Sequence, residues 1–256
     1  MLEARIRDAR ANKDILLMTH IVVGYPSLAA SLEMVDAMVE AGVDLMELQI
    51  PFSEPMADGP VILAANQKAL AQGITVEHCF ELAGTVARKH PIPFLFMSYY
   101  NVLFRAGVTS FVQRMRAAGL CGAIVPDLPP EEAGEYLTAM KAADADPIFI
   151  FSPSTPNDRL RHIAEHARGF VYCVARKGVT GLHTTFTAEL DAYLARCRAA
   201  TNLPLALGFG VQGASDVAFL CGKVDIAVVG SATLRLIDEK GISAVEPFIR
   251  GLRGLQ

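Results

Sequence analysis

The feature that most constrains this chain is a regular alternation of short apolar runs with longer amphipathic stretches along its 256 residues. Most of the apolar runs are nearly continuous in Val, Ile, Leu and Phe, which is typical of parallel strands covered on both faces. The sequence predicts eight such strands, at Ile15–Val23, Val43–Ile50, Pro93–Tyr99, Gly122–Val125, Pro147–Phe151, Phe170–Val174, Leu205–Leu207 and Asp225–Val229.

Helix signals fall between these strands. Ser27 and Thr75 are of the residue type that caps a helix N-terminus, and Pro130 suits a first helical position. Helices are therefore expected from Ser27 to Gly42, over Val76–Lys89 and after Pro129, and also at Thr187–Ala199 and Ser231–Asp238.

Eight strand–helix units in about 250 residues predict an α/β fold, a single (β/α)8 barrel that forms one domain over residues 1–256. An open doubly wound sheet is the alternative. The leading segment Met1–Asn12 is expected to be an extra helix that closes the bottom of the barrel. In such a barrel the chemistry lies at the C-terminal ends of the strands.

Composition excludes several other classes. With 52% hydrophobic residues and a net charge of −4, the chain is too apolar to be disordered. Its 27 acidic and 23 basic residues leave no positive excess for nucleic acid or a charged membrane surface.

The cysteines and the N-terminus indicate a compartment. The five cysteines are widely spaced without a Cys-x-x-Cys pair, which favours reduced thiols over disulfides or a zinc site. Charged residues near the N-terminus leave no apolar core for a signal peptide. The longest uncharged stretch, Ile15–Leu32, contains His20, Gly24 and Pro26, and so favours a strand and a helix start over a membrane span. We expect a soluble cytoplasmic protein.

Two carboxylates mark the end of the second strand and the loop after it. Strand alternation places Glu47 and Gln49 on one face, and an unpaired carboxylate among apolar neighbours is costly unless it is used. The following loop carries three prolines and a glycine and presents Asp58 near the strand ends. The structural alternative is that Glu47 is salt-bridged and Asp58 caps a helix starting at Pro60. Position at a barrel-strand end favours function.

Glycine-bearing turns follow the last three strands, at Gly178–Gly181, Gly208–Gly210 and Gly230-Ser231. Glycines allow backbone N–H groups to approach an anion, and a helix starting near Ser231 would direct its positive end toward it. One such turn alone indicates only a tight connection, but three at adjacent strand ends favour a phosphate site.

Other polar residues are assigned no chemistry. Arg176 and Lys177 are as readily a solvated pair as part of the site. His20 is expected to be a core histidine, and His162 and His166, without a third ligand nearby, to be surface residues rather than a metal site.

A phosphate clamp opposite a carboxylate pair suits acid–base cleavage of a C–C bond in a small sugar phosphate. No predicted strand end carries a lysine in an apolar run, which argues against an aldolase that forms an imine. Another phosphate-binding barrel enzyme, such as an isomerase, is the less favoured alternative.

The segment Glu47–Pro60, which reads Glu-Leu-Gln-Ile-Pro-Phe-Ser-Glu-Pro-Met-Ala-Asp-Gly-Pro, closely resembles the signature of the tryptophan synthase α subunit family. Further blocks resemble the same family in the same order: Gly24-Tyr25-Pro26, Met97–Asn101, Val125–Glu132, Gly178–Gly181, Gly208-Phe209-Gly210 and Val229-Gly230-Ser231. Together they span almost the whole chain.

The resemblance implies retro-aldol cleavage of indole-3-glycerol phosphate into indole and glyceraldehyde 3-phosphate. It implies Glu47 as the acid–base residue and Asp58 as the partner of the indole N–H. The implied substrate-binding residues are Tyr172, Thr180, Gly181, Phe209, Gly210, Gly230 and Ser231, with Thr180 in a lid.

The same resemblance implies no cofactor on this chain and a β subunit that carries pyridoxal phosphate, within an α2β2 heterotetramer. The implied partner interface is Phe52, Glu54, Asn101, Phe104 and Pro129. A stand-alone lyase and a weakly active subunit that mainly activates its partner remain alternatives.

Four residues depart from the family pattern. Gln49 and Ala227 replace a usual glycine, Glu54 replaces aspartate and Val102 replaces proline. Gln49 is expected to narrow the pocket or to hydrogen-bond the acid, and the changes at Glu54 and Val102 bear on the partner surface.

Overall fold

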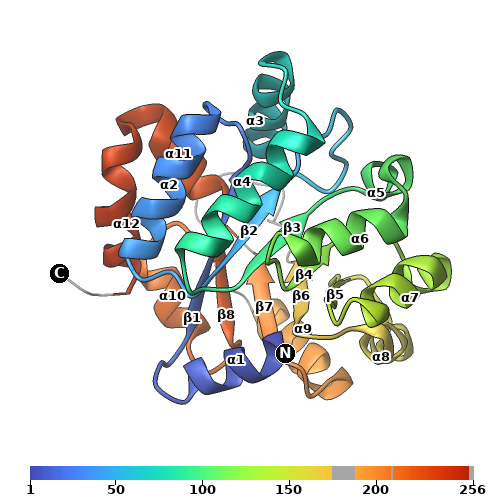
Figure 1. Ribbon diagram of the computed structural model, residues 1–256. Coiled ribbons are helices and arrows are strands. Elements are labelled where there is room, and N and C mark those ends of the chain that lie inside the picture. Colours follow the sequence, from blue (N-terminus) through green and yellow to red (C-terminus); the bar gives the residue numbers. More distant parts are fainter. Residues whose placement is uncertain (175–187, 209, 254–256) are drawn as a thin grey trace.

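In the computed structural model, which describes residues 1–174, 188–208 and 210–253, eight parallel strands close into a barrel in chain order (Figure 1). The predicted barrel is therefore confirmed, and the open sheet is excluded because β1 pairs with β8. Each predicted strand agrees with an observed one to within two residues at either end. The strands are β1 Leu16–Val22, β2 Leu45–Gln49, β3 Phe94–Met97, β4 Gly122–Ile124, β5 Asp146–Phe151, β6 Val171–Val174, β7 Leu205–Gly208 and β8 Ile226–Val229.

The alternation of side chains along each strand divides the core in two. Residues facing into the barrel form one buried cluster, which includes Leu16, Leu45 and Ile124. Residues facing outward, such as Leu17 and Met46, pack beneath the surrounding helices in a larger cluster. The inner cluster fills the barrel, so chemistry is left to the strand ends.

Helices surround the strands (Figure 1). They are α1 Leu2–Arg10, α2 Leu28–Glu40, α3 Pro60–Ala71, α4 Val76–Lys89, α5 Tyr100–Ala106, α6 Val108–Ala117, α7 Gly134–Ala142, α8 Asn157–His166, α9 Ala188–Ala200, α10 Ala214–Leu220, α11 Ser231–Lys240 and α12 Val245–Leu252. Short 3₁₀ turns occur at Pro130–Glu132 and Ile242–Ala244.

Two of the predicted helix caps are confirmed by their hydrogen bonds. The Ser27 hydroxyl accepts from the N–H of Ala30, and Thr75 forms a reciprocal capping box with His78. The prediction at Pro130 is wrong in detail, because Pro130 opens only a 3₁₀ turn and the α-helix begins at Gly134. Proline supplies the helical φ for one turn but does not decide whether the chain continues as an α-helix.

The extra N-terminal helix is confirmed, and it lies across the end of the barrel where the strands begin (Figure 1). Its Leu2 and Ile6 side chains are buried in the inner cluster. The N–H of Leu2 donates to Asp146 at the start of β5, with 3.1 Å between nitrogen and oxygen. This helix therefore closes the bottom of the barrel and leaves the opposite end for a ligand.

The expectations about the cysteines and about membrane spans can be compared with the structure. All five cysteines are free. Within the described residues, none of the helices combines the length and apolar character needed to cross a bilayer.

Candidate active site

A cavity of about 200 Å³ opens at the C-terminal ends of the strands. Every strand contributes at least one lining residue, and these are His20, Glu47, Met97, Ile124, Ile150, Tyr172, Val174, Gly208 and Val228. The lining is apolar on the β3, β4 and β5 side and polar where β1, β2 and β6 approach. Such a cavity suits a flat apolar group beside a few directed polar groups.

Glu47 lies on β2 in register with His20 on β1. Both side chains are almost fully buried, with each residue 3% exposed. His20 Nδ1 and Glu47 Oε1 are 3.1 Å apart. The carboxylate is thus paired, as the structural alternative required, yet it also lines the cavity.

Asp58 reaches the same cavity because the loop after β2 folds back over the strand ends. Asn66 on α3 accepts from the N–H of Phe52, and the Tyr99 hydroxyl accepts from the N–H of Ala57, so both ends of the loop are held. The Gln49 amide donates to Asp58 with 2.6 Å between Nε2 and Oδ2. Asp58 does not cap α3, whose N-cap residue is Gly59 without a side-chain bond.

The pKa values of Asp58 and His20 reflect burial opposed by the charges and hydrogen bonds of neighbouring groups. Burial raises the pKa of Asp58 above its ordinary value, although the charge of His20 and hydrogen bonds from Gln49 and Tyr99 lower it in part. Burial alone would lower the pKa of His20. The hydrogen bond and charge of Glu47, with the charge of Asp58, outweigh burial and raise it.

Tyr172 at the end of β6 also lines the cavity. Burial, followed by the charges of Glu47 and Asp58, raises the pKa of its hydroxyl well above the ordinary value, so the phenol stays protonated as a donor. The ring fits because β7 has Gly208 beside it. A Cβ placed on Gly208 would lie 2.4 Å from the Tyr172 hydroxyl oxygen.

The glycine-bearing turns after β7 and β8 line the same cavity. Gly210, Gly230 and Ser231 line it, and α11 begins at Ser231. The first N–H groups of a helix have no intrahelical acceptor, so they and the helix dipole favour an anion at this point. Thr180, Gly181 and Phe209 lie outside the described residues, as do Arg176 and Lys177.

The residues implied as a partner interface lie on loops and a helix at the same end of the barrel. Glu54, Asn101, Phe104 and Pro129 are exposed, and the Phe104 residue is 64% exposed. Phe52 is half-buried and stacks on Tyr99 with 5.2 Å between ring centroids.

His20, expected to be a core histidine, is buried with 3% exposed, and its ring in addition lines the cavity and contacts Glu47. The sequence signal that could have placed His20 beside Glu47 was its position along the strand. His20 and Glu47 occupy inward positions near the ends of consecutive strands, and adjacent strands of a barrel place such residues side by side. Gln49 is expected to narrow the pocket or to hydrogen-bond the acid; its amide nitrogen donates instead to the second carboxylate, Asp58.

The expectation that His162 and His166 lack a third ligand nearby is also wrong. Their ligand atoms and one of Glu165 lie within 4.8 Å of one another on α8, the metal-capable group found among the described residues. A residue at i+3 on a helix shares the face of the i and i+4 histidines. These side chains already pair locally, since His162 Nε2 lies 3.1 Å from Glu131 and His166 Nδ1 lies 2.9 Å from the His162 carbonyl oxygen. They do not line the cavity.

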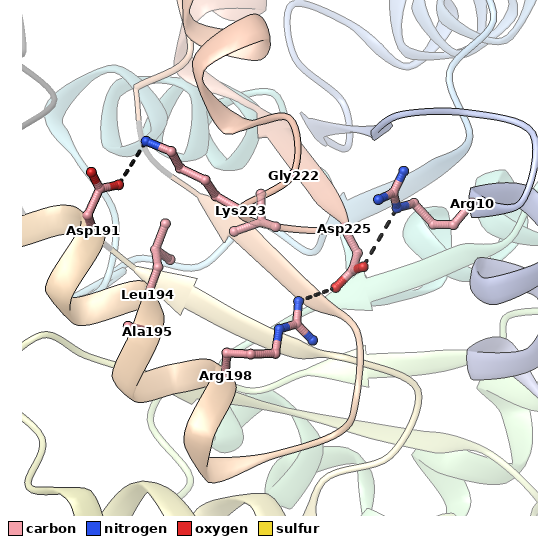
Figure 2. Close-up of a pocket in the computed structure, with 9 residues that line it drawn as sticks. Arg10, Asp191, Leu194, Ala195, Arg198, Gly222, Lys223 and Asp225 are labelled. Atoms are coloured by element: carbon pink, nitrogen blue, oxygen red, sulfur yellow. Dashed lines mark hydrogen bonds and ion pairs between the residues drawn. The ribbon is translucent and has the colours of Figure 1, made fainter.

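A second hollow, of about 250 Å³, lies at the opposite end of the barrel (Figure 2). Its charged groups pair with one another, Lys223 with Asp191 and both Arg10 and Arg198 with Asp225. Asp225 also accepts from the N–H of Leu205, with 2.8 Å between nitrogen and oxygen. These contacts tie α1 and α9 to the strand starts, which indicates a role in stability at this face.

Comparisons with known proteins agree with this geometry. The family model described as tryptophan synthase alpha chain matches residues 6–249. A tryptophan synthase alpha chain of Syntrophotalea carbinolica is 64% identical, with 99% of this chain and 100% of the relative covered. That of Desulforapulum autotrophicum is 62% identical, with 98% and 100% covered.

Solved structures give the same result. A tryptophan synthase structure from Mycobacterium tuberculosis aligns with a TM-score of 0.92 at 32% identity, covering 99% of this chain and 96% of that one. The alpha subunit from Legionella pneumophila aligns with a TM-score of 0.90 at 28% identity, covering 99% and 97%. The chain therefore belongs to the tryptophan synthase alpha chain family, whose activity is a lyase reaction of tryptophan biosynthesis.

Proposed function

We propose that the cavity binds indole-3-glycerol phosphate and cleaves the bond between the indole ring and the glycerol phosphate chain, giving indole and glyceraldehyde 3-phosphate. The observation that carries the proposal is that Glu47 and Asp58 line one cavity together with Gly230 and Ser231. Two carboxylates and a helix N-terminus in one cavity support a substrate with an indole ring and a phosphate.

Glu47 acts as the acid and then as the base in this proposal. It protonates the indole carbon that bears the side chain, which places the positive charge on the ring nitrogen. It then removes the proton from the neighbouring hydroxyl, the C–C bond breaks, and the hydroxyl carbon becomes the aldehyde. The bonding pair returns to the ring and neutralises the nitrogen, so the protonated ring itself accepts the electrons and this chain needs no cofactor of its own.

Asp58 accepts a hydrogen bond from the indole N–H and stabilises the charge that develops there. The interaction strengthens as the ring becomes positive, so it lowers the barrier rather than only tightening binding. Tyr172 lies beside Glu47 and Asp58 with its phenol protonated, and we assign it to positioning the substrate. Thr180 and Phe209 lie outside the described residues, and we propose them as further residues that contact the substrate.

The phosphate is held by backbone N–H groups at the start of α11 and by the turns of Gly181 and Gly210. Gly230 supports this role because it lines the cavity directly before α11 and carries no side chain. The absence of a side chain allows close backbone approach to an anion.

Members of the family work with a beta subunit, and we propose that this chain does so in an α2β2 heterotetramer with pyridoxal phosphate on the partner. Phe104 and Met56 support this, because they are 64% and 81% exposed on segments that follow β3 and β2. Exposed large apolar side chains at one end of a barrel are typical of a docking surface. We further treat residues 1–256 as one domain in the cytoplasm, consistent with five free thiols.

Substitution of Glu47 tests the assignment. Glu47→Gln keeps the shape of the side chain but cannot exchange the proton, so we expect indole release to fall by at least about 100-fold while substrate binding is retained. Binding is measured by calorimetry and indole release by chromatography. The control is Glu33→Gln on the exposed face of α2. Turnover close to that of the control would assign the acid–base step to another residue.

The two alternatives are separated by the same assay with and without a beta subunit. A lyase with substantial activity alone releases indole at a rate that depends little on the partner. A subunit that mainly activates its partner releases little indole in either case, while raising the partner's synthesis of tryptophan from indole and serine.

A further inference from the structure

His20 is placed where the proposed chemistry begins. It lies on β1 in register with Glu47, is 3% exposed, and has its Nδ1 3.1 Å from Glu47 Oε1. A Cβ added to Gly230, the residue before α11, would lie 3.5 Å from the Cβ of His20 and 3.8 Å from its ring, so His20 lies near this turn. The side chain therefore lies between the acid–base carboxylate and the proposed phosphate end.

Gln49 forms the second link. Its amide nitrogen donates to Asp58, whereas its Oε1 is buried without a hydrogen-bond partner, as is the Nε2 of His20. Gln49 follows Glu47 by two residues on β2 and so lies on the same face of the strand, and Glu47 is in register with His20. A small rotation that brings His20 Nε2–H to Gln49 Oε1 would satisfy both buried atoms.

We propose that His20 is a positioning residue for the lyase reaction, which holds one oxygen of Glu47 so that the other faces the substrate and supplies the positive charge between Glu47 and Asp58. The proposal rests on the assignment of Glu47 above. It adds a residue that acts through Glu47 and, by way of Gln49, through Asp58.

The physical reason is that Glu47, once it has given its proton to the ring, and Asp58 are two carboxylates in one small cavity, and a cation beside them offsets their repulsion. A doubly protonated imidazole donates from both ring nitrogens, to Glu47 on one side and toward Gln49 on the other. A neutral imidazole has only one donor and leaves one of these contacts unmade.

The groups that face His20 decide when it is charged. Glu47 from β2 and Asp58 from the following loop raise its pKa above the ordinary value, against burial, which lowers it. Tyr172 from β6 faces the same carboxylates and stays neutral. From the side of β8 and α11 the lining residues are Val228, Gly230 and Ser231, none of which titrates. The imidazolium therefore persists to higher pH than that of an ordinary histidine, and it is lost as the pH rises through this raised pKa.

Two variants separate charge from hydrogen bonding. His20→Asn retains an amide donor close to the position of Nδ1 but cannot titrate, whereas His20→Phe retains a ring of similar size without a donor. Both are compared with His166→Asn on the outer helix α8, which does not line the cavity. The measurements are kcat and KM for indole release across the pH range.

For His20→Phe we expect kcat to fall about 10- to 100-fold, as for loss of a hydrogen bond to a charged group, with KM changed by less than about threefold. For His20→Asn we expect kcat at the optimum to recover most of that loss. We expect the wild type to lose kcat on the alkaline side as His20 deprotonates, and this fall should be absent or displaced in both variants. Retention of full kcat in His20→Phe, or the same alkaline fall in all proteins, would overturn the proposal.

Because His20→Phe changes a buried residue, a second measurement uses the wild-type side chain. Histidine-labelled protein gives the titration of His20 by nitrogen NMR, and we expect its pKa to be lower in Glu47→Gln than in the wild type. An unchanged titration would overturn the proposal. If Glu47→Gln is inactive while the His20 variants match the control, the positioning role fails and the proposed function stands.

Discussion

The side-chain amide of Gln49 donates a hydrogen bond to Asp58, with 2.6 Å between Nε2 and Oδ2. Gln49 lies on the inward face of β2, and Asp58 lies on the loop that folds back over this strand. The bond holds Asp58 toward the cavity and stabilises its ionised form, against the burial that raises its pKa. The position of the second carboxylate therefore depends on a residue that departs from the family pattern.

Replacing Gln49 should change the pH dependence of indole release. Because the Gln49 bond lowers the pKa of Asp58, Gln49→Leu raises that pKa further. Activity that needs the Asp58 carboxylate is lost as the pH falls through this pKa. We therefore expect the acid side of the kcat profile to move to higher pH, and kcat at mildly alkaline pH to fall by about tenfold or less.

The control for this prediction is a double-variant cycle. In Asp58→Asn there is no carboxylate at this position to titrate, so adding Gln49→Leu should leave the residual activity with the same pH profile. A shift of the acid side that persists in the Asp58→Asn background would show that Gln49 acts through another group.

Adding a side chain at Gly230 should weaken phosphate binding. Gly230→Val places two methyl groups where the backbone is proposed to approach the phosphate, with loss of one or two charge-assisted hydrogen bonds. We expect KM to rise about 10- to 100-fold with a smaller change in kcat. The matched control is Gly134→Val at the first residue of α7, where a Cβ meets no atom within 4 Å. Equal KM values in the two variants would place the phosphate elsewhere.

Substitutions at Gly208 and Tyr172 should have coupled effects on the free energy of unfolding. A Cβ on Gly208 would lie 2.4 Å from ring and hydroxyl atoms of Tyr172, so Gly208→Ala forces the ring to move. We expect the free energy of unfolding to fall by about 1–3 kcal/mol, measured by urea denaturation. In a Tyr172→Ala background the same substitution should cost much less, because the ring is gone. Additive effects would mean that the ring is not what excludes a side chain at Gly208.

A charge at Phe104 should weaken the beta subunit without affecting the cavity. Phe104 is 64% exposed on α5 and does not line the cavity. We expect Phe104→Asp to raise the Kd for a beta subunit about 10- to 50-fold, as for an aromatic anchor of an interface. Indole release without the partner should be unchanged. The control is Leu32→Asp, which changes another exposed apolar residue, on α2, and should bind the partner normally. Equal Kd values would remove Phe104 from the interface.

The sequence predicted the local structure well where the signal was local. The apolar runs gave all eight strands, and Ser27 and Thr75 cap the predicted helices with hydrogen bonds to residues three positions ahead. It failed at Pro130, where the choice between a 3₁₀ turn and a longer helix depends on how the next helix packs.

The candidate site was predictable in part. Glu47, Asp58, Gly230 and Ser231 were identified from strand ends and turns, and the cavity contains all four. The burial of His20 was expected but its place beside the acid–base carboxylate was not, because a histidine in an apolar strand has the same sequence signature in the core and in a cavity. Only the register of β1 against β2 places it beside Glu47.

By itself, the sequence determined the alternation of strands and helices, the barrel and the two carboxylates, because these depend on periodicity and on residue type at strand ends. Tertiary structure alone decided which side chains meet. The closure of β1 on β8, the folding back of the Asp58 loop and the pairing of Glu47 with His20 join residues far apart in sequence. Such contacts depend on strand register and packing, which no local pattern encodes.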